Sequence, residues 1–425
     1  MSIIFSKSGG PSPVLEEACP EGFAREDSAR AGELPNLLVI SQQIPESGRA
    51  GSLLLQRLLE HYPAERLLVV GPAPDPRAER LDCRYQTLGL PLQRLNRTRL
   101  SRLVRSLRAV GLMPTFGTGA VEKLLGDFRP EMVLTVMEEH PYYHLAYRFA
   151  RAHGLPLGLL IFDLPGIFEK VYGWARGRQR RLEREVYRSA SKRLCVSPEM
   201  SDYLNEEFGV TGDVLYPKRS EKLTPRPLAE TRQLKQPGLL TVGYAGTTAY
   251  GRGPQLHDMM PAFREAGACL RVYSGDDWTW GAADVVTYCG YAPPDETWAK
   301  IKRQCDAVIL PYCWPDNERY RDLYKTSFPS KLPEYLALGM PILMVGPEYV
   351  AGIKWGLRHE QAALVVTGDD PAQWAAALRQ LKESAALREQ LGRRALEAGA
   401  RDFDPAVIQR QFINYLKEAG AASMP

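Results

Sequence analysis

The sequence predicts an α/β protein made of two doubly wound domains that face each other across a cleft. Three observations predict this class. Short apolar runs alternate with helical segments along most of the chain. The runs are apolar at almost every position, as strands of a parallel sheet covered on both faces are. The alternation stops at a charged, Pro-rich segment, 220–238, and then begins again.

The first domain is expected at 35–219. Its strands are predicted at 37–40, 67–71, 132–136, 157–162 and 193–196, and its helices at 52–61, 143–153 and 198–208. The segment 220–238 is predicted to be a linker. Residues 1–34 are rich in Gly, Pro, Ser, Ala and Glu and show little periodicity, so we expect a mobile N-terminal extension.

The second domain is expected at 239–402. Its strands are predicted at 239–243, 269–273, 285–288, 307–310, 341–345 and 363–366. The pattern from 371 to 421 is helical, with a break at Phe403-Asp404-Pro405. Residues 403–425 are therefore expected to form a C-terminal helix that packs back on the first domain.

Composition excludes several classes of protein. The net charge of the 425 residues is only +4, which argues against nucleic acid as a partner. The seven cysteines are scattered and form no CxxC, which indicates reduced, buried thiols and a cytoplasmic protein without zinc. No apolar run reaches 18 residues, and the first residues do not have the pattern of a signal peptide.

The most informative segment is 327–341, Ser-Phe-Pro-Ser-Lys-Leu-Pro-Glu-Tyr-Leu-Ala-Leu-Gly-Met-Pro. Ser330 is expected to cap a helix whose free N–H groups, together with Lys331, suit a phosphate. Glu334 lies one turn further on, where a carboxylate reaches ribose hydroxyls. The alternative is an ordinary amphipathic helix with Lys331 and Glu334 in solvent.

A glycine-rich loop, 246–253, follows the first strand of the second domain. Gly246 permits close approach of the backbone to a phosphate, and Arg252 offers paired hydrogen-bond donors. An ordinary turn is the alternative. Tyr291 is expected either to flank a nucleobase or to belong to the core. Asp276 and Asp277 are adjacent, which is typical of a turn and not of a metal site.

The segment 327–341 resembles the signature of the retaining glycosyltransferases of the GT-B fold, family 4. Two further segments are similar to that family: 243–248, Gly-Tyr-Ala-Gly-Thr-Thr, resembles its glycine loop, and 195–200, Cys-Val-Ser-Pro-Glu-Met, resembles the end of its N-terminal domain. The likeness extends from about residue 36 onwards. It implies two Rossmann-like domains, with the nucleotide sugar bound by the C-terminal one and the acceptor by the N-terminal one.

The resemblance also implies roles for single residues. It places Glu334 on the ribose of a UDP- or GDP-linked sugar and Ser330 and Lys331 near the diphosphate. The remaining donor-binding residues that it implies lie in the glycine loop: Gly246, Thr247, Thr248 and Arg252. Thr326 stands where many members carry a second acid, and Thr247 where many carry a cation.

Candidate acceptor and catalytic residues follow strands of the first domain. Gly48, Arg49 and Gly51 lie in the first loop, where the resemblance implies contact with the acceptor or the donor phosphate. Asp163 and His140 follow two later strands, and ligands bind at the carboxyl ends of such strands. We expect Asp163 first and His140 second to touch the acceptor hydroxyl or the donor sugar. The alternatives are a turn cap for Asp163, a loop residue for His140 and a solvated Arg49.

Basic charge is concentrated in the first half of the chain. Residues 36–200 hold 25 Lys and Arg against 16 Asp and Glu. Between Arg84 and Arg108, four leucines and a valine (Leu95, Leu100, Leu103, Val104, Leu107) are expected on one helical stripe, with the cations off it: Arg97, Arg102, Arg105 and Arg108. This pattern favours either an anionic membrane surface or a solvated outer helix face.

Together these features predict a hexosyltransferase-type enzyme of glycan synthesis that acts with retention and without metal or other cofactor. The expected acceptor is a glycan, a glycolipid or a small hydroxylated molecule. The protein is expected in the cytoplasm or peripherally on the inner membrane, where lipid-linked acceptors lie. Two alternatives stay open: a GT-B enzyme that acts on the nucleotide sugar alone, as an epimerase does, and a catalytically silent binding module.

Overall fold

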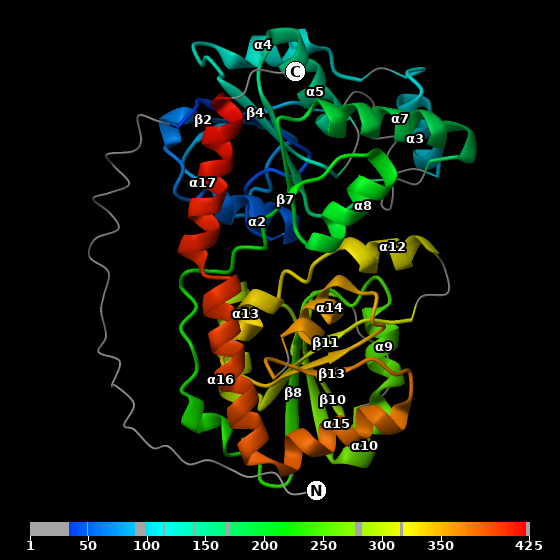
Figure 1. Cartoon of the computed structure of the whole chain (residues 1–425), viewed down its shortest axis with the longest axis vertical. Coiled ribbons are helices and arrows are strands. Elements are labelled where there is room, and N and C mark those ends of the chain that lie inside the picture. The colour runs from blue at the N-terminus through cyan, green and yellow to red at the C-terminus, as the bar shows by residue number, and fades with distance from the viewer. Residues whose placement is uncertain are drawn as a thin grey trace, which may run out of the picture. The chain divides into compact units, whose positions relative to one another are not determined.

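The computed structural model describes residues 34–421 apart from 49, 90–98, 114, 139–140, 166–170, 277–282, 315–317 and 360. The predicted N-terminal extension, except Leu34, lies outside the described residues. From Pro35 onwards the chain forms one compact unit. This unit contains two parallel sheets (Figure 1), which confirms the predicted fold class.

The first sheet has seven parallel strands in the order β3-β2-β1-β4-β5-β6-β7. Its strands are β1 (Leu37–Ile40), β2 (Leu67–Gly71), β3 (Arg84–Thr87), β4 (Met132–Val136), β5 (Leu157–Ile161), β6 (Lys192–Cys195) and β7 (Asp213–Val214). The helices described between and after them are α2 (Ala50–Leu59), α3 (Ser101–Ala109), α4 (Thr118–Leu125), α5 (Tyr142–His153), α7 (Gly173–Ser189) and α8 (Pro198–Phe208).

The second sheet has six parallel strands in the order β10-β9-β8-β11-β12-β13. Its strands are β8 (Leu240–Ala245), β9 (Ala268–Tyr273), β10 (Val286–Tyr288), β11 (Ala307–Pro311), β12 (Ile342–Val345) and β13 (Leu364–Val366). The helices that follow β8 are α9 (Arg252–Asp258), α10 (Met260–Ala266), α11 (Pro294–Gln304), α12 (Glu318–Thr326), α13 (Leu332–Ala337), α14 (Ala351–Arg358), α15 (Pro371–Glu383), α16 (Ala385–Asp402) and α17 (Pro405–Ala421).

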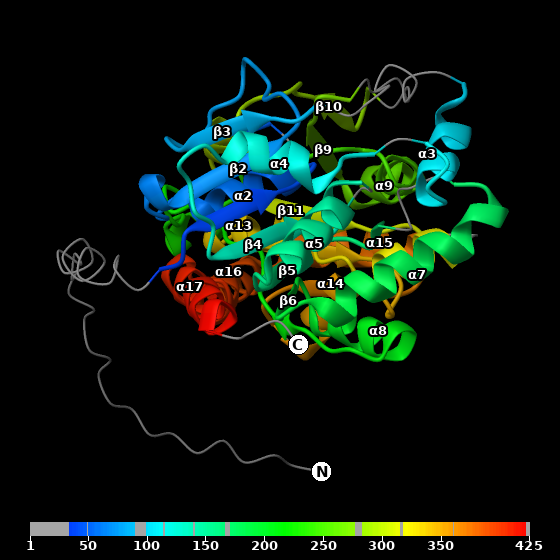
Figure 2. The ribbon, with the colours of Figure 1, turned by 90° about the horizontal axis from the view of Figure 1, so that it is seen from above.

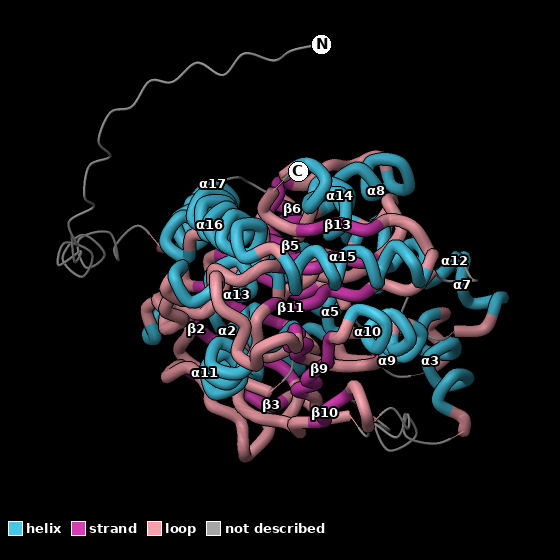
Figure 3. Tube along the Cα trace, turned by 90° about the horizontal axis from the view of Figure 1, so that it is seen from below, coloured by secondary structure: helices cyan, strands magenta, loops and turns pink. Residues whose placement is uncertain are grey.

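The central strands are largely apolar because helices cover both faces of each sheet, although Thr135 of β4 and Thr241 of β8 are polar. Helices α10 and α15 run alongside the second sheet (Figure 3), and Ile309 and Leu343 share a core cluster with residues of these two helices. Their neighbours Val308 and Ile342 point to the other face and pack with Trp355 of α14. This alternation buries both sides of each strand, as the continuous apolar runs predict.

The chain passes between the two sheets twice: after β7, and again between α16 and α17. We call the first sheet with its helices and α17 the N-lobe, and the second sheet with its helices the C-lobe. α17 contacts β5 and α16 contacts β12 (Figure 1). At the two passages, Tyr216 and Phe403 lie in ring contact at 5.0 Å, and Phe328 contacts both rings.

Three sequence predictions need correction. The helical stripe is wrong: in α3 Val104 and Arg108 are buried, while Leu100 and Leu103 are 55% and 39% exposed. The reason is that α3 packs against α7, and this packing turns the 104–108 side of α3 inward (Figure 2). The helical tail is interrupted a second time, at Ser384, whose hydroxyl caps α16. Of the six free cysteines described, only two are fully buried.

Candidate functional site

A cavity of about 190 Å³ lies where the carboxyl ends of both sheets meet. Both sheets change strand order next to their first strand, and ligands of such sheets bind at that point. The N-lobe lines the cavity with Gln43, Ala50, Gly51, Leu54, Phe162, Asp163 and Val196. The C-lobe lines it with Tyr244, Thr247, Tyr250, Arg252, Leu310, Pro311, Tyr312, Leu323, Tyr324, Ser327, Phe328, Pro329, Ser330 and Lys331.

Two cations, Lys331 and Arg252, line this cavity close to one another. Burial, with Arg252 as the next cause, lowers the pKa of Lys331 to about 7. The Lys331 ammonium lies 5.6 Å from the ring centroid of Tyr244. Gly246 has φ +119°, and a Cβ there would come within 2.1 Å of Lys331 Cε, so glycine makes room for the lysine.

Neither cation forms a direct ion pair in the described part of the chain. Among the described residues, no side-chain hydrogen bond or ion pair with a carboxylate engages Lys331 or Arg252. Two like charges facing a partly desolvated cavity are unfavourable until an anion joins them. The cavity is therefore suited to an anionic ligand that spans both side chains.

The glycine loop after β8 is held by Asp276. One carboxylate oxygen of Asp276 accepts hydrogen bonds from Thr247 Oγ1 at 2.9 Å, Thr248 N at 2.5 Å and Thr248 Oγ1 at 2.9 Å. Burial alone would raise the pKa of Asp276, but these hydrogen bonds outweigh it and lower the pKa. The hydroxyls of both threonines are thus bound by the protein, and Asp276 belongs to a turn that shapes the loop.

Asp163 joins the two lobes inside the cavity. Its carboxylate accepts a hydrogen bond from the hydroxyl of Ser327. Burial raises the pKa of Asp163 to about 6, and Ser327 and Arg252 oppose this rise. A carboxylate with such a pKa exchanges protons near neutral pH, as general acids and bases do.

Glu334 does not line the described cavity. Its side chain is 3% exposed and forms an ion pair with Arg57 of α2, Nη1 to Oε1, at 2.5 Å. The solvated alternative for Glu334 is therefore wrong. Its second oxygen, Oε2, is buried without a partner among the described residues.

The start of α13 differs from the prediction. The helix begins at Leu332 with Lys331 at the N-cap position, so Ser330 is not the cap. Leu332 N donates to Pro329 O at 3.0 Å, and Pro333 has no N–H. The helix end thus offers few free donors, and the side chains of Lys331 and Arg252 supply most of the positive character.

Of the remaining residues that the sequence predicts for the site, some line the cavity and others do not. Gly51 lines the cavity, where a Cβ would come within 1.9 Å of Gln43 Oε1, whereas nothing lies within 4 Å of a Cβ at Gly48. Arg49 and His140 lie outside the described residues. Tyr291 is 67% exposed, so its core alternative is wrong, and it does not line the cavity as described.

Sequence reasoning missed several cavity residues. Ser327 lies at the start of the signature segment, but no pattern indicates that it meets Asp163. Gln43, Tyr312 and Tyr324 also line the cavity. Gln43 follows β1 and Tyr312 follows β11, and these two strands lie where the strand order of each sheet changes. Tyr324 lies in α12, the helix before the signature segment. Such positions are too general to select these residues from the sequence.

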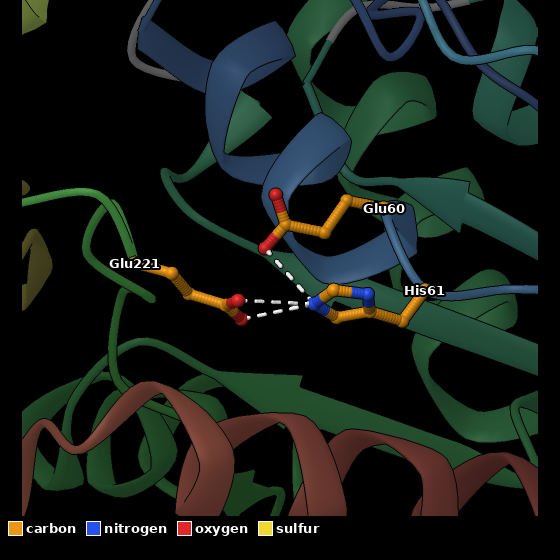
Figure 4. Close-up of side chains that lie close together, drawn as sticks. All are labelled: Glu60, His61 and Glu221. Atoms are coloured by element: carbon orange, nitrogen blue, oxygen red, sulfur yellow. Dashed lines mark hydrogen bonds and ion pairs between the residues drawn. The ribbon is translucent and has the colours of Figure 1, made fainter. Parts of the chain in front are cut away.

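A second cluster of titratable groups lies near the lobe boundary: Glu60, His61 and Glu221 (Figure 4). His61 Nε2 lies 3.0 Å from Glu221 and 3.7 Å from Glu60. The buried ammonium of Lys218 already bonds both carboxylates, at 2.6 Å to Glu60 and 2.8 Å to Glu221. Both carboxylates thus already have a buried cation as their partner, so we assign the cluster to structure.

Comparisons with known proteins agree with this geometry. Residues 53–215 match the model of the Glycosyl transferase 4-like domain. Sucrose-phosphate synthase from Thermosynechococcus elongatus is similar in structure, with a TM-score of 0.65, 16% identity and coverage of 88% of this chain and 96% of that chain. No curated protein sequence matches.

Two further solved structures are similar over nearly their whole length. HepE of Anabaena in complex with UDP and glucose has a TM-score of 0.62, 13% identity and coverage of 90% of this chain and 99% of that chain. WaaG, a glycosyltransferase involved in lipopolysaccharide biosynthesis, has a TM-score of 0.60, 12% identity and coverage of 89% and 99%. At these identities the likeness establishes the shared fold.

Proposed function

We propose that this chain, which carries a glycosyl transferase 4-like domain and has the GT-B fold, transfers a hexose from a nucleotide diphosphate to a hydroxyl acceptor. One observation carries the proposal: Lys331 and Arg252 face the cavity between the lobes, and neither forms a direct ion pair with a described residue. A sugar nucleotide brings a diphosphate that satisfies both.

The same two cations fit the chemistry of the leaving group. When the bond between the sugar and the diphosphate breaks, negative charge grows on the departing phosphate oxygen. Cations fixed before the reaction stabilise that charge without reorganisation. Lys331 is fixed in this sense, against Gly246 and the Tyr244 ring.

The acceptor enters on the N-lobe side, beside Asp163 and Gly51. Asp163 is ionised above about pH 6, so at neutral pH its carboxylate orients the acceptor hydroxyl or receives its proton. Transfer with retention remains our proposal from the family resemblance.

The nucleotide is proposed to be UDP or GDP, with UDP as the first probe because HepE binds UDP and UDP-glucose. Glu334 is proposed as the ribose ligand, and Thr247, Thr248 and Gly246 as the loop around the phosphates. The domain boundaries at 219, 238 and 402 likewise stay predictions.

Calorimetric titration with UDP, UDP-glucose and the GDP analogues tests donor binding, and binding of none of them contradicts the proposal. Incubating UDP-glucose without an acceptor separates the alternatives: an epimerase converts the sugar nucleotide alone, whereas a transferase needs an acceptor for turnover. A binding module binds the nucleotide but does not turn over UDP-glucose, either with or without an acceptor.

The acceptor is proposed to be lipid-linked, at the cytoplasmic surface of the inner membrane. No helix among the described residues combines the length and apolarity needed to cross a bilayer. Around α3 and the start of α7, however, several large apolar side chains are exposed: Leu100, Leu103, Leu112, Tyr172 and Trp174. Figure 2 shows these two helices side by side.

At least one cation of α3, Arg102, contacts this apolar patch. The guanidinium of Arg102 stacks on the Tyr172 ring at 4.4 Å, and Tyr172 stacks on Trp174. Arg105 lies on the same helix, α3, whereas Arg108 is buried and unavailable for lipid, and Arg97 lies outside the described residues. Aromatic and basic side chains together suit the headgroup region of an anionic membrane.

A further inference from the structure

Arg57, in the first helix of the N-lobe, contacts Glu334 in the C-lobe. The two side chains are 9% and 3% exposed, and the ion pair of 2.5 Å uses only one oxygen of Glu334. The other oxygen, Oε2, is buried and has no partner among the described residues. An unsatisfied buried carboxylate oxygen is costly, and in native proteins it usually has a donor that binds there.

Arg57 is itself held from two directions by Lys218. The ammonium of Lys218 donates to the backbone oxygen of Arg57 at 3.0 Å, and Arg57 Nη1 donates to the backbone oxygen of Lys218 at 3.1 Å. Lys218 is in turn fixed by Glu60, Glu221 and Gln409, at 2.6, 2.8 and 2.8 Å. The guanidinium therefore has little freedom to leave Glu334.

This arrangement fixes the orientation of the Glu334 carboxylate. The guanidinium occupies Oε1, which leaves Oε2 as the acceptor for a further hydroxyl or N–H donor. Glu334 lies one helical turn from Lys331, whose side chain faces the cavity. A nucleotide diphosphate bound at Lys331 brings its ribose hydroxyls to this part of the protein.

We propose that Arg57 is a positioning residue of the donor site: it holds Glu334 through Oε1 and leaves Oε2 to accept from the ribose of the nucleotide. The inference rests on the proposed function. It makes nucleotide affinity depend on a residue of the opposite lobe, so that the donor site is complete only when α2 and α13 are in contact.

The test measures UDP binding by calorimetry in the full-length chain. Arg57→Met is expected to weaken UDP binding about tenfold, which is ~1.4 kcal/mol. Arg57→Lys keeps a charge near Oε1 and is expected to lie between wild type and Arg57→Met. The donor KM should rise more than kcat falls. Arg358→Met is the matched control, because it removes another ion pair between the lobes, Arg358–Glu199 at 2.7 Å.

A double-mutant cycle separates positioning from general stability. If Arg57 acts through Glu334, then Arg57→Met adds no further loss of UDP affinity in a Glu334→Gln background. The inference would be overturned by additive losses in the cycle or by a loss of equal size in Arg358→Met. Wild-type UDP affinity in a folded Arg57→Lys or Arg57→Met protein would also overturn it. If the wild-type protein binds neither UDP nor GDP, the proposed function fails, and the inference about Arg57 fails with it.

Discussion

The carboxylate of Asp163 accepts a hydrogen bond from the hydroxyl of Ser327, which joins the loop after β5 to the loop before α13. The two residues lie 164 positions apart in the chain and belong to different lobes. Because burial raises the pKa of Asp163 and this hydrogen bond lowers it, the acidity of Asp163 depends on the two lobes being in contact.

Asp163→Asn is expected to lower kcat about a hundredfold, the usual size of a general acid–base contribution. The UDP affinity should change much less, because Asp163 is hydrogen-bonded to Ser327 and is not proposed to contact the diphosphate that Lys331 and Arg252 bind. The carboxylate forms as the pH rises through about 6, so wild-type turnover should rise with an apparent pKa near 6. A pH–rate profile checks this, and an unchanged profile in Asp163→Asn hands the role to another residue.

Affinity for UDP-glucose is expected to fall as the pH rises above about 7. Lys331 has a pKa of about 7 in the free protein. A bound diphosphate stabilises the ammonium and raises that pKa, so binding above pH 7 requires uptake of a proton. The Kd should then increase by up to about tenfold per pH unit.

Calorimetry between pH 6 and 9 measures this dependence. UDP-glucose is the probe because its diphosphate does not titrate in that range. In Lys331→Arg the side chain stays charged, and the dependence should disappear. A Kd that does not change with pH in the wild-type protein contradicts the role of Lys331.

Lys218→Met is expected to lower the free energy of unfolding by about 3 kcal/mol, because it leaves carboxylates and backbone acceptors without their buried cation. Urea denaturation followed by circular dichroism measures the change. Lys235→Met is the control: its ion pair with Glu230, at 3.4 Å and partly exposed, should cost at most about 0.5 kcal/mol. Equal effects of the two substitutions would rule out the special role of Lys218.

Trp174→Ala combined with Tyr172→Ala is expected to weaken binding to anionic vesicles about tenfold, since both rings lose a buried apolar contact with lipid. Co-sedimentation with vesicles measures the bound fraction. Binding should also weaken with salt, because cations of α3 contribute. Equal binding of the wild-type protein to neutral and anionic vesicles, or no binding, contradicts the proposal.

The sequence predicts the parts of the fold that hydrophobic burial determines. The central strands are buried at every position, and their apolar runs locate them to within a residue or two. β3 and β7 lie at the edges of the first sheet, where only one side is paired, and their polar residues give no such run. The edge strands β10 and β13 of the second sheet carry apolar residues and are predicted at 285–288 and 363–366. The polar edge strands of the first sheet therefore escape the apolar pattern, whereas those of the second do not.

The sequence predicts those residues of the candidate site that directly follow a parallel strand. Asp163 and the glycine loop follow strands, and both reach the cavity because the carboxyl ends of parallel strands point to one crevice. Contacts between distant segments had no sequence signal: Arg57 and Glu334 are 277 positions apart. The cap at Ser330 failed because Pro333 fits the first turn of a helix that begins one residue later than expected.

The ring contact between Tyr216 and Phe403 has a mechanical consequence. Because the two passages of described chain between the lobes touch there, a substitution that removes the Phe403 ring loosens both connections at once. Phe328 packs on both rings and also forms part of the cavity wall. One side chain thus belongs both to the covalent connection of the lobes and to the wall that a ligand would meet.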